Sequence, residues 1–330
     1  MRKISIGVGF RGDNIESVIR QAKVADEAGV DSLFVAETWG YDAFTLLSVL
    51  AHETKRIKLG TSIVNIYSRS PAALAQHFGT LDTLSGGRMI IGLGTSGHRV
   101  IEHFHGVRFD KPFTRIREYV EIINTLMRGE KLLYDGKIFK LERGFTLRFD
   151  PVRDHIPIWI ASITPKSVKQ TAAIADGWMP IFFPHSQWRD QVGAMHAAIR
   201  EAGRDPTGFE IRCPSGVTVT DKPARAAGMR RGTAAFYIAR MGDFYYEHFV
   251  RMGYEKEADA VRAAWDEGGS AAGAAAVPEA LVDEMGTAGD VDTCVAALEA
   301  ADAAGFTTHS VNVAERDEEK RAAIYEKLIG

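Results

Sequence analysis

The stretch RMIIGLGTSGHRVIEHFHG, residues 88–106, decides between two folds. Gly92, Gly94 and Gly97 spell G-x-G-x-x-G directly after a short apolar run. In a Rossmann domain this motif opens the first βαβ unit, a helix starts at the third glycine, and an acidic residue ends the next strand about 20 residues on. Here the apolar run is the fourth along the chain, and the segment about 20 residues on, REYVEII, has a helical pattern. The glycines therefore argue against a Rossmann site.

The runs on either side of this stretch favour a barrel. Eight short apolar or β-branched runs alternate with helical patterns, and most lack the polar alternation of half-exposed strands, which is typical of parallel strands buried on both faces. A closed (β/α)8 TIM barrel of about 250 residues plus insertions fits the length, and a doubly wound open sheet is the alternative. We predict strands at 4–10, 32–37, 57–64, 89–94, 156–162, 177–183, 209–220 and 308–314, and helices starting near Asp13 and Pro165 and covering 43–54, 71–85, 115–127, 187–202, 291–305 and 316–329.

Two segments interrupt this alternation. Residues 132–149, after the fourth strand, are typical of a hairpin or irregular excursion, and residues 222–288 form a large insertion between strands 7 and 8. Within the insertion, 241–254 is rich in aromatic residues, which indicates a helix packed on the barrel, a lid over a pocket, or both. The Ala/Gly-rich stretch 263–276 has the composition of a surface hinge or mobile segment. No linker divides the chain, so we expect a single domain over 1–330.

Composition narrows the classes of partner and compartment. The net charge is −3 and 25% of the residues are charged, so there is no basic excess for a nucleic acid. Cys213 and Cys294 lie far apart and outside any C-x-x-C motif, which fits a reducing cytosol. No uncharged apolar stretch approaches the ~20 residues that cross a bilayer. We expect a cytoplasmic protein with a small-molecule substrate and neither a nucleic-acid nor a membrane partner.

A metal site is the second possibility that residues 88–106 raise. His98, Glu102 and His105 stand at i, i+4 and i+7, which is one helix face, and His103 is nearby. The H-E-x-x-H order is missing, and a third ligand at i+7 of one helix reaches a shared metal poorly. We therefore expect a polar helical turn that ends at Gly106, and no metal.

Several motifs carry a resemblance to a known family. They are LDTLSGGRMIIGLGTSG (81–97), the pattern G-V-x-F-x-x-P-x-x-R-x-x-E (106–118), RIKLGTSIVNIYSRSPAALAQ (56–76), PIWIASITPKSVKQTAAIADGW (157–178) and VAETWGYDAFTLL (35–47). In this order they resemble the bacterial luciferase-like flavin and deazaflavin oxidoreductases over nearly the whole chain. The resemblance implies a (β/α)8 barrel with an insertion after strand 7 and a homodimer.

The resemblance also implies a cofactor. The Glu-Thr-Trp-Gly and Gly-Thr-Ser-Gly segments are similar to those of members that use the deazaflavin coenzyme F420, including relatives of methylenetetrahydromethanopterin reductase. Such members transfer a hydride at C5 of the deazaflavin, and the protein orients the cofactor and excludes competing reactions. An FMN-dependent monooxygenase and a catalytically silent flavin- or deazaflavin-binding protein are the alternatives.

Individual roles follow from the resemblance. It implies that Glu37 is the acid/base candidate, which would need a raised pKa to donate a proton near neutral pH, and that Trp39 is a pocket wall. It implies a non-proline cis peptide at Ser62-Ile63, with Ile63 pressed against the back of the cofactor ring. The remaining implied cofactor contacts lie at the ends of strands 4 and 5 and at the following helix: Gly94, Thr95, Ser96, Ala161, Ser162 and Lys166.

The chain departs from the family pattern in three places. Thr38 stands where many deazaflavin members have His, and Thr164 stands where a Gly is usual. Residues 7–10 lack the carboxylate that methanopterin reductases carry on strand 1. These departures argue against methylenetetrahydromethanopterin as the substrate. The aromatic insertion points instead to a substantially apolar one.

Overall fold

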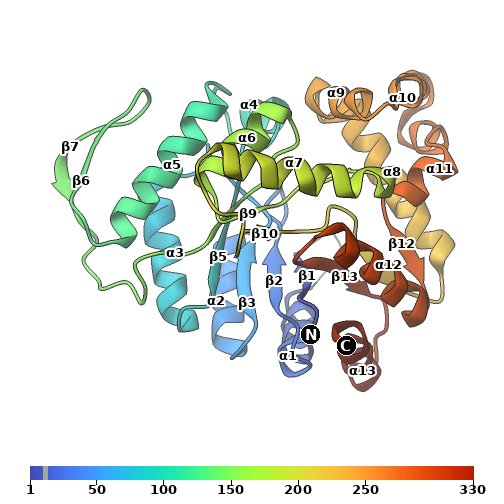
Figure 1. The fold of residues 1–330 in the computed structure, drawn as a ribbon, viewed down its shortest axis with the longest axis horizontal. Helices are drawn as coiled ribbons and strands as arrows, with labels where there is room; N and C mark the ends of the chain where they lie inside the picture. The colour runs from blue at the N-terminus through green and yellow to red at the C-terminus, as the bar shows by residue number, and fades with distance from the viewer. Residues whose placement is uncertain (10–13) are drawn as a thin grey trace.

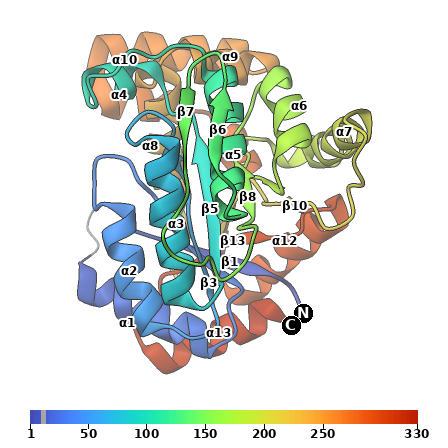
Figure 2. The ribbon, with the colours of Figure 1, turned by 90° about the vertical axis from the view of Figure 1, so that its left-hand side faces the viewer.

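The computed structural model describes residues 1–9 and 14–330, in which eight parallel strands form a barrel surrounded by helices (Figures 1 and 2). A parallel bridge between Arg212 and Thr308 joins the seventh strand to the eighth and closes the ring. The predicted (β/α)8 barrel is thereby confirmed. The barrel strands, in order around the ring, are β1 (Ile4–Val8), β2 (Ser32–Val35), β3 (Lys58–Thr61), β5 (Met89–Gly94), β8 (Ile158–Ile160), β9 (Gly177–Trp178), β10 (Glu210–Ile211) and β13 (His309–Val313).

Helices follow the strands close to the predicted positions. Most begin at a residue whose side chain accepts a hydrogen bond from the backbone N–H three positions on, such as Ser70 and Asp290. Of the predicted boundary residues, Phe10 and Asp13 lie outside the described part of the chain. The helices around the barrel are α1 (Ile15–Glu27), α2 (Ala43–Glu53), α3 (Pro71–Ser85), α5 (Pro112–Met127), α6 (Pro165–Ile174), α7 (Trp188–Glu201), α12 (Val291–Ala304) and α13 (Glu318–Ile329).

The core has two parts. A large outer cluster fills the space between strands and helices. A small inner cluster fills the interior of the ring and is made of Phe34, Ile90 and Trp159 from three barrel strands and Met179 from the residue after β9. The barrel is therefore closed by side chains in its middle, and any ligand space must lie toward one end.

Two of the predicted strands are interrupted. The run 57–64 divides into β3 and the short β4 (Val64–Asn65), which pairs with β5 beyond a cis peptide bond. The run 209–220 is not one strand, as predicted, but β10 and β11 (Val217–Val219), and β11 pairs with β13. Residues 214–216, Pro-Ser-Gly, separate the two pieces, because such residues favour a turn.

Both insertions, residues 132–149 and 222–288, contain regular secondary structure. The predicted hairpin is β6 (Leu132–Asp135) and β7 (Lys140–Phe145), which projects at the left of Figure 1. The insertion between strands 7 and 8 contains α8 (Pro223–Arg240), α9 (Asp243–Arg251), α10 (Glu255–Ala275), α11 (Glu279–Glu284) and β12 (Thr287–Gly289).

The Ala/Gly-rich stretch 263–276, whose composition indicates a surface hinge or mobile segment, is largely helical. Most of it lies in α10, which is broken only at Gly269, where φ is +73°. A β-carbon on Gly273 would come within 2.6 Å of the Trp265 ring. The small residues thus permit close packing within the helix.

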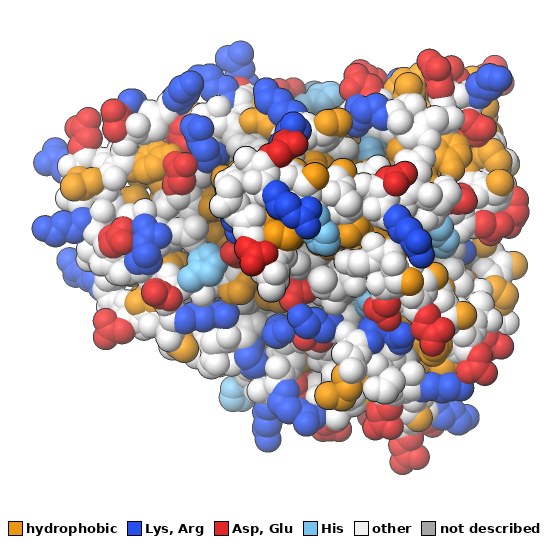
Figure 3. Space-filling model, in the orientation of Figure 1, with side chains coloured by type: hydrophobic (Ala, Val, Ile, Leu, Met, Phe, Trp, Pro, Cys, Tyr) orange, Lys and Arg blue, Asp and Glu red, His pale blue; other side chains and the backbone are white. Residues whose placement is uncertain are grey.

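The face of the molecule shown in Figure 3 carries a mixture of charged and hydrophobic side chains. Figure 3 shows acidic and basic side chains interspersed over this face, with hydrophobic groups in small patches between them. Within the described residues, no helix combines the length and apolarity of a bilayer span.

Candidate active site

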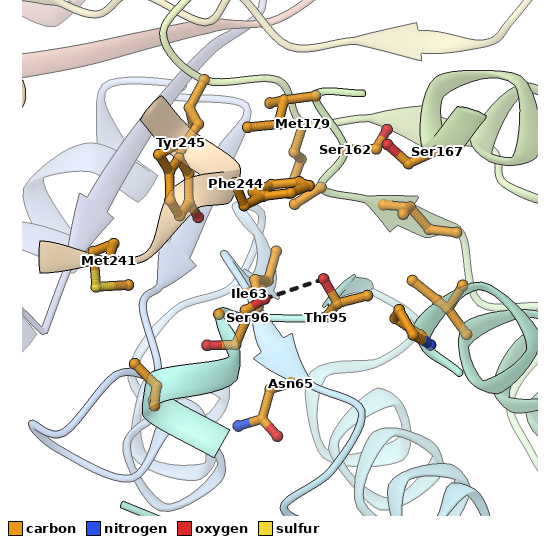
Figure 4. A pocket seen from close by; sticks show the side chains of 18 of the residues that line it. Ile63, Asn65, Thr95, Ser96, Ser162, Ser167, Met179, Met241, Phe244 and Tyr245 are labelled. Atoms are coloured by element: carbon orange, nitrogen blue, oxygen red, sulfur yellow. Dashed lines mark hydrogen bonds between the residues drawn. The ribbon is translucent and has the colours of Figure 1, made fainter. Parts of the chain in front are cut away.

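A cavity of about 510 Å³ opens at the carboxyl ends of the barrel strands. Its lining comes from the segments after β2, β3, β5, β8 and β9, from the start of α5 and from α8 and α9. The size falls within the range of about 300–1,000 Å³ typical of small-molecule sites, and the carboxyl end is where TIM barrels place their chemistry. Figure 4 shows this cavity from close by.

The β3–β5 side of the cavity is built from backbone in close contact. A β-carbon on Gly92 would lie 1.7 Å from the Thr61 carbonyl oxygen, and one on Gly94 would lie 2.8 Å from the Ile63 side chain. The Thr61 hydroxyl fixes the contact, because it donates to the Gly92 carbonyl (2.7 Å) and accepts from the Gly92 N–H (3.1 Å). The first two glycines of the motif are therefore needed by the neighbouring strand itself.

The cis peptide bond between Ser62 and Ile63 is present as the resemblance implies. Ile63 lies between Gly94 and the open cavity, near Thr95 and Ser96 (Figure 4). Ser96 has a left-handed φ of +57°, and the Thr95 hydroxyl donates to its carbonyl oxygen (3.2 Å). These predicted residues form one continuous wall.

Glu37 lies in the cavity wall just beyond β2. Its carboxylate forms a two-point ion pair with Arg69, with Nη1–Oε1 at 2.5 Å and Nη2–Oε2 at 3.2 Å. Oε2 also accepts a hydrogen bond from the N–H of Ala43, the first residue of α2. Arg69 contacts Asp42 as well and lies over the Phe44 ring. The role of Glu37 in proton transfer stays a prediction, and sequence reasoning missed Arg69, its partner 32 positions away.

The strand-5 segment is divided between the cavity and the surface. Ala161 and Ser162 line the cavity, and the Ser162 hydroxyl is hydrogen-bonded to that of Thr171 (2.8 Å). Lys166 does not line it. Its ammonium group lies 4.6 Å over the ring of Phe113, which does. Of the predicted cofactor residues, two do not line the cavity: Gly94 lies behind the Ile63 side chain, and Lys166 lies against Phe113. The structure brings the other six together in the cavity wall: Ser62, Ile63, Thr95, Ser96, Ala161 and Ser162.

The other side of the cavity is aromatic and comes mainly from the insertion. Phe244 and Tyr245 on α9 and Tyr237 on α8 line it, with Met241 between the helices (Figure 4). Burial raises the pKa of both tyrosine hydroxyls, so they remain protonated. Trp39 completes this side, half exposed. Both interpretations of the aromatic stretch 241–254 hold together: the helix packs on the barrel and also covers the cavity.

The histidine-rich stretch after β5 is a short helix, α4 (His98–His103), with Gly97 at its N-cap. His105 is within 3.2 Å of the Asn65 amide nitrogen, and the Glu102 carboxylate accepts from the Phe109 N–H. In residues 1–9 and 14–330 no three His, Cys, Asp or Glu side chains are grouped so that they could hold a metal ion.

Arg212, one residue beyond β10, also lines the cavity, and sequence analysis missed it. The charged residues at 210 and 212 within the predicted strand segment FEIRC were the available signal. Its Nη atoms donate to the hydroxyls of Ser62 (3.0 Å) and Ser310 (3.1 Å). The buried Nε has no hydrogen-bond partner.

The residues present fit a flat ring cofactor. Ile63 over Gly94 gives an apolar backing, the aromatic side faces it across the cavity, and the buried Arg212 Nε–H is a donor without an acceptor. This combination of apolar walls with a few polar groups is what orients a ring in a pocket.

Comparison with known proteins identifies the family. The model of the luciferase-like monooxygenase family matches residues 4–308, so the chain belongs to that family. A Mycobacterium tuberculosis protein named "Putative coenzyme F420-dependent oxidoreductase" is 35% identical over 304 residues, with 86% of each chain covered.

Solved structures share the fold. The coenzyme F420-dependent tetrahydromethanopterin reductase of Methanopyrus kandleri superposes with a TM-score of 0.83 at 24% identity, covering 99% of this chain and 97% of that one. The oxygenating component of 3,6-diketocamphane monooxygenase from Pseudomonas putida, in complex with FMN, superposes with a TM-score of 0.69 at 19% identity, covering 99% and 97%. The chain is thus a luciferase-like oxidoreductase, in a family whose members use F420 or FMN.

Proposed function

We propose that this protein is a coenzyme F420-dependent oxidoreductase that transfers a hydride between C5 of the deazaflavin and an organic substrate. The observation that carries the proposal is the backbone-built wall, in which Ile63 packed on Gly94 forms the apolar backing for a ring. The 35% identity to a protein named for F420 favours the deazaflavin over FMN. When bound, the deazaflavin supplies the hydride chemistry.

The chain's own residues would position the cofactor and the substrate. Ile63, Thr95 and Ser96 would hold the ring from one side, and Ala161 and Ser162 would continue toward its tail. Lys166, in the first turn of α6, would meet a phosphate of the tail on leaving the Phe113 ring. The aromatic side, with Phe244 and Tyr245, would select an apolar substrate.

The test is titration of the protein with F420 and FMN in parallel, followed by absorbance or fluorescence. We expect F420 to bind at least about tenfold more tightly than FMN, which corresponds to about 1.4 kcal/mol. Tighter FMN binding would favour the monooxygenase alternative. Tight F420 binding without turnover on a broad panel of alcohols, ketones and alkenes would favour a silent binding protein.

Glu37 is proposed as the residue that handles the proton on the substrate side. Glu37→Gln keeps the size of the side chain and removes its charge and its proton. Turnover should fall by about a hundredfold or more, as is typical for loss of a general acid or base, with F420 affinity retained. Asp42→Asn, which alters the other carboxylate on Arg69, is the control and should keep turnover. Full activity of Glu37→Gln would exclude the role.

A further inference from the structure

Arg212 is a cation inside the barrel without a carboxylate partner. Its two hydrogen bonds go to the hydroxyls of Ser62 and Ser310, and its guanidinium carbon lies 5.0 Å from the centre of the Phe34 ring. Among the described residues, no Asp or Glu oxygen lies within ion-pair distance of it. Burial lowers its pKa to about 10, so it remains charged at neutral pH.

Comparison with two other arginines shows which partners Arg212 lacks. Arg88 also lacks a carboxylate, but its donors make five hydrogen bonds to oxygens around the start of β5. Arg153 is paired with the buried Asp82. A guanidinium has five N–H donors, and Arg212 uses two of them on neutral hydroxyls. A buried charge is costly unless it is paired, so the cavity lacks the group that would compensate Arg212.

The position of Arg212 in the cavity indicates which group would compensate its charge. Ser62, its partner, directly precedes Ile63, the residue proposed to back the ring. Phe34 beneath it belongs to the inner cluster that closes the barrel. Arg212 therefore lies at the floor of the cavity, beside the wall proposed for the ring.

We propose that Arg212 binds the electron-rich edge of the cofactor ring and stabilises the reduced, anionic ring over the oxidised one. This inference rests on the proposed function. Adding a hydride, which brings two electrons and one hydrogen nucleus, to the ring at C5 adds one negative charge relative to the oxidised ring, and that charge spreads over the pyrimidine edge. A guanidinium facing the edge forms charge-assisted hydrogen bonds to the reduced anion that are stronger than those to the oxidised ring, whose pyrimidine edge carries less negative charge.

The experiment measures the affinity of the full-length protein for oxidised and for chemically reduced F420 under anaerobic conditions. Arg212→Gln removes the charge and keeps an amide that can reach a serine hydroxyl. We expect the affinity for reduced F420 to fall about tenfold more than that for oxidised F420.

The matched control is Arg204→Gln. Arg204 also makes two hydrogen bonds to neutral oxygens and lies near a phenylalanine ring, but it does not line the cavity. The Arg204→Gln variant should leave the ratio of the affinities for oxidised and reduced F420 unchanged. An equal loss of both affinities in Arg212→Gln, or no loss, would overturn the proposal.

A second measurement needs only the unaltered protein. The absorbance of bound reduced F420 is titrated with pH, and the ring should stay anionic to a pH about one unit lower than free reduced F420. A bound ring that gains its proton at the same or a higher pH would overturn the proposal even if the variant fails to fold. Failure of the unaltered protein to bind F420 would refute the proposed function, and the proposal about Arg212 with it. Binding with an unshifted ring would refute the proposal about Arg212 alone.

Discussion

The two sides of the cavity are built by different means. On the β3–β5 side, the spaces next to Gly92 and Gly94 are filled by the Thr61 carbonyl and the Ile63 side chain. On the facing side, Phe244 and Tyr245 reach in from α9, an element of the insertion rather than of the barrel. One side is determined by how two strands approach each other, and the other by which side chains a helix presents.

This difference suggests a division of labour. Where this wall is backbone, at Gly92 and Thr61, it cannot be altered without disturbing the strands, so it suits a constant partner such as the proposed cofactor. A wall made of side chains on an inserted helix can change without disturbing the barrel, so it suits the variable partner, the substrate.

The largest effect is expected where the backbone contact is closest. Gly92→Ala places a methyl group against the Thr61 carbonyl, which belongs to a buried strand and cannot move aside. We expect the free energy of unfolding to fall by about 3 kcal/mol or more, measured by denaturant titration.

The control for Gly92→Ala is a helical glycine with open space around it. A β-carbon on Gly193 in α7 meets nothing within 4 Å. Gly193→Ala should raise stability by about 0.5–1 kcal/mol, since Ala is the better helix former. If Gly92→Ala unfolds at the same denaturant concentration as the unaltered protein, the β3–β5 side is not the rigid wall described above.

The next effect is on cofactor binding. Gly94→Ala meets Ile63 Cδ1 and Cγ1 at 2.8 Å, so the isoleucine must shift toward the proposed ring site. We expect the affinity for F420 to fall about tenfold with little loss of stability, because a side chain can move where a backbone cannot. Ile63→Val removes Cδ1, and the double variant should recover part of the affinity. A fully additive double variant would contradict this contact as the cause.

Substitutions on the aromatic side of the cavity are expected to affect the substrate rather than the cofactor. Phe244→Ala should leave the F420 affinity within about twofold and lower kcat/KM for apolar substrates about threefold to tenfold, because one aromatic contact with the substrate is lost. Met229→Ala removes an exposed apolar residue of the same insertion that does not line the cavity, and it should change neither quantity. A loss of F420 affinity in Phe244→Ala would show that the aromatic side also holds the cofactor.

The backbone-built side was the more predictable of the two from sequence. The residue limits of β5 and α3 agree with the pattern of apolar and capping residues, and the break after β3 was implied by the resemblance. Such features depend on local chemistry: β-branched runs, a Ser-Pro helix start, glycines where strands touch.

What the sequence could not reveal were contacts between distant segments. The Glu37–Arg69 ion pair joins two loops, and the Arg212–Ser62 hydrogen bond spans 150 positions. The division of 209–220 was missed because the apolar and β-branched residues on the two sides of the turn residues at 214–216 were treated as one run. The helical state of 263–276 was missed because tertiary packing on α8 overrides its glycine content.

The smallest effect is expected at the amino ends of β8 and β9, far from either side of the cavity. His155 Nε2 lies 2.8 Å from Asp176 Oδ2, and this hydrogen bond raises the pKa of His155. A raised folded-state pKa contributes stability that is fully present below about pH 6.5 and is lost as the pH rises through the folded value. His155→Gln should therefore destabilise the protein at about pH 6 and progressively less at higher pH.

The size of this effect is limited by exposure. The side chains of His155 and Asp176 are both more than a third exposed, so solvent screening limits the difference in the free energy of unfolding to less than about 1 kcal/mol. Denaturant unfolding at constant ionic strength measures it, and a difference that grows with pH would show that Asp176 does not hold the protonated imidazole.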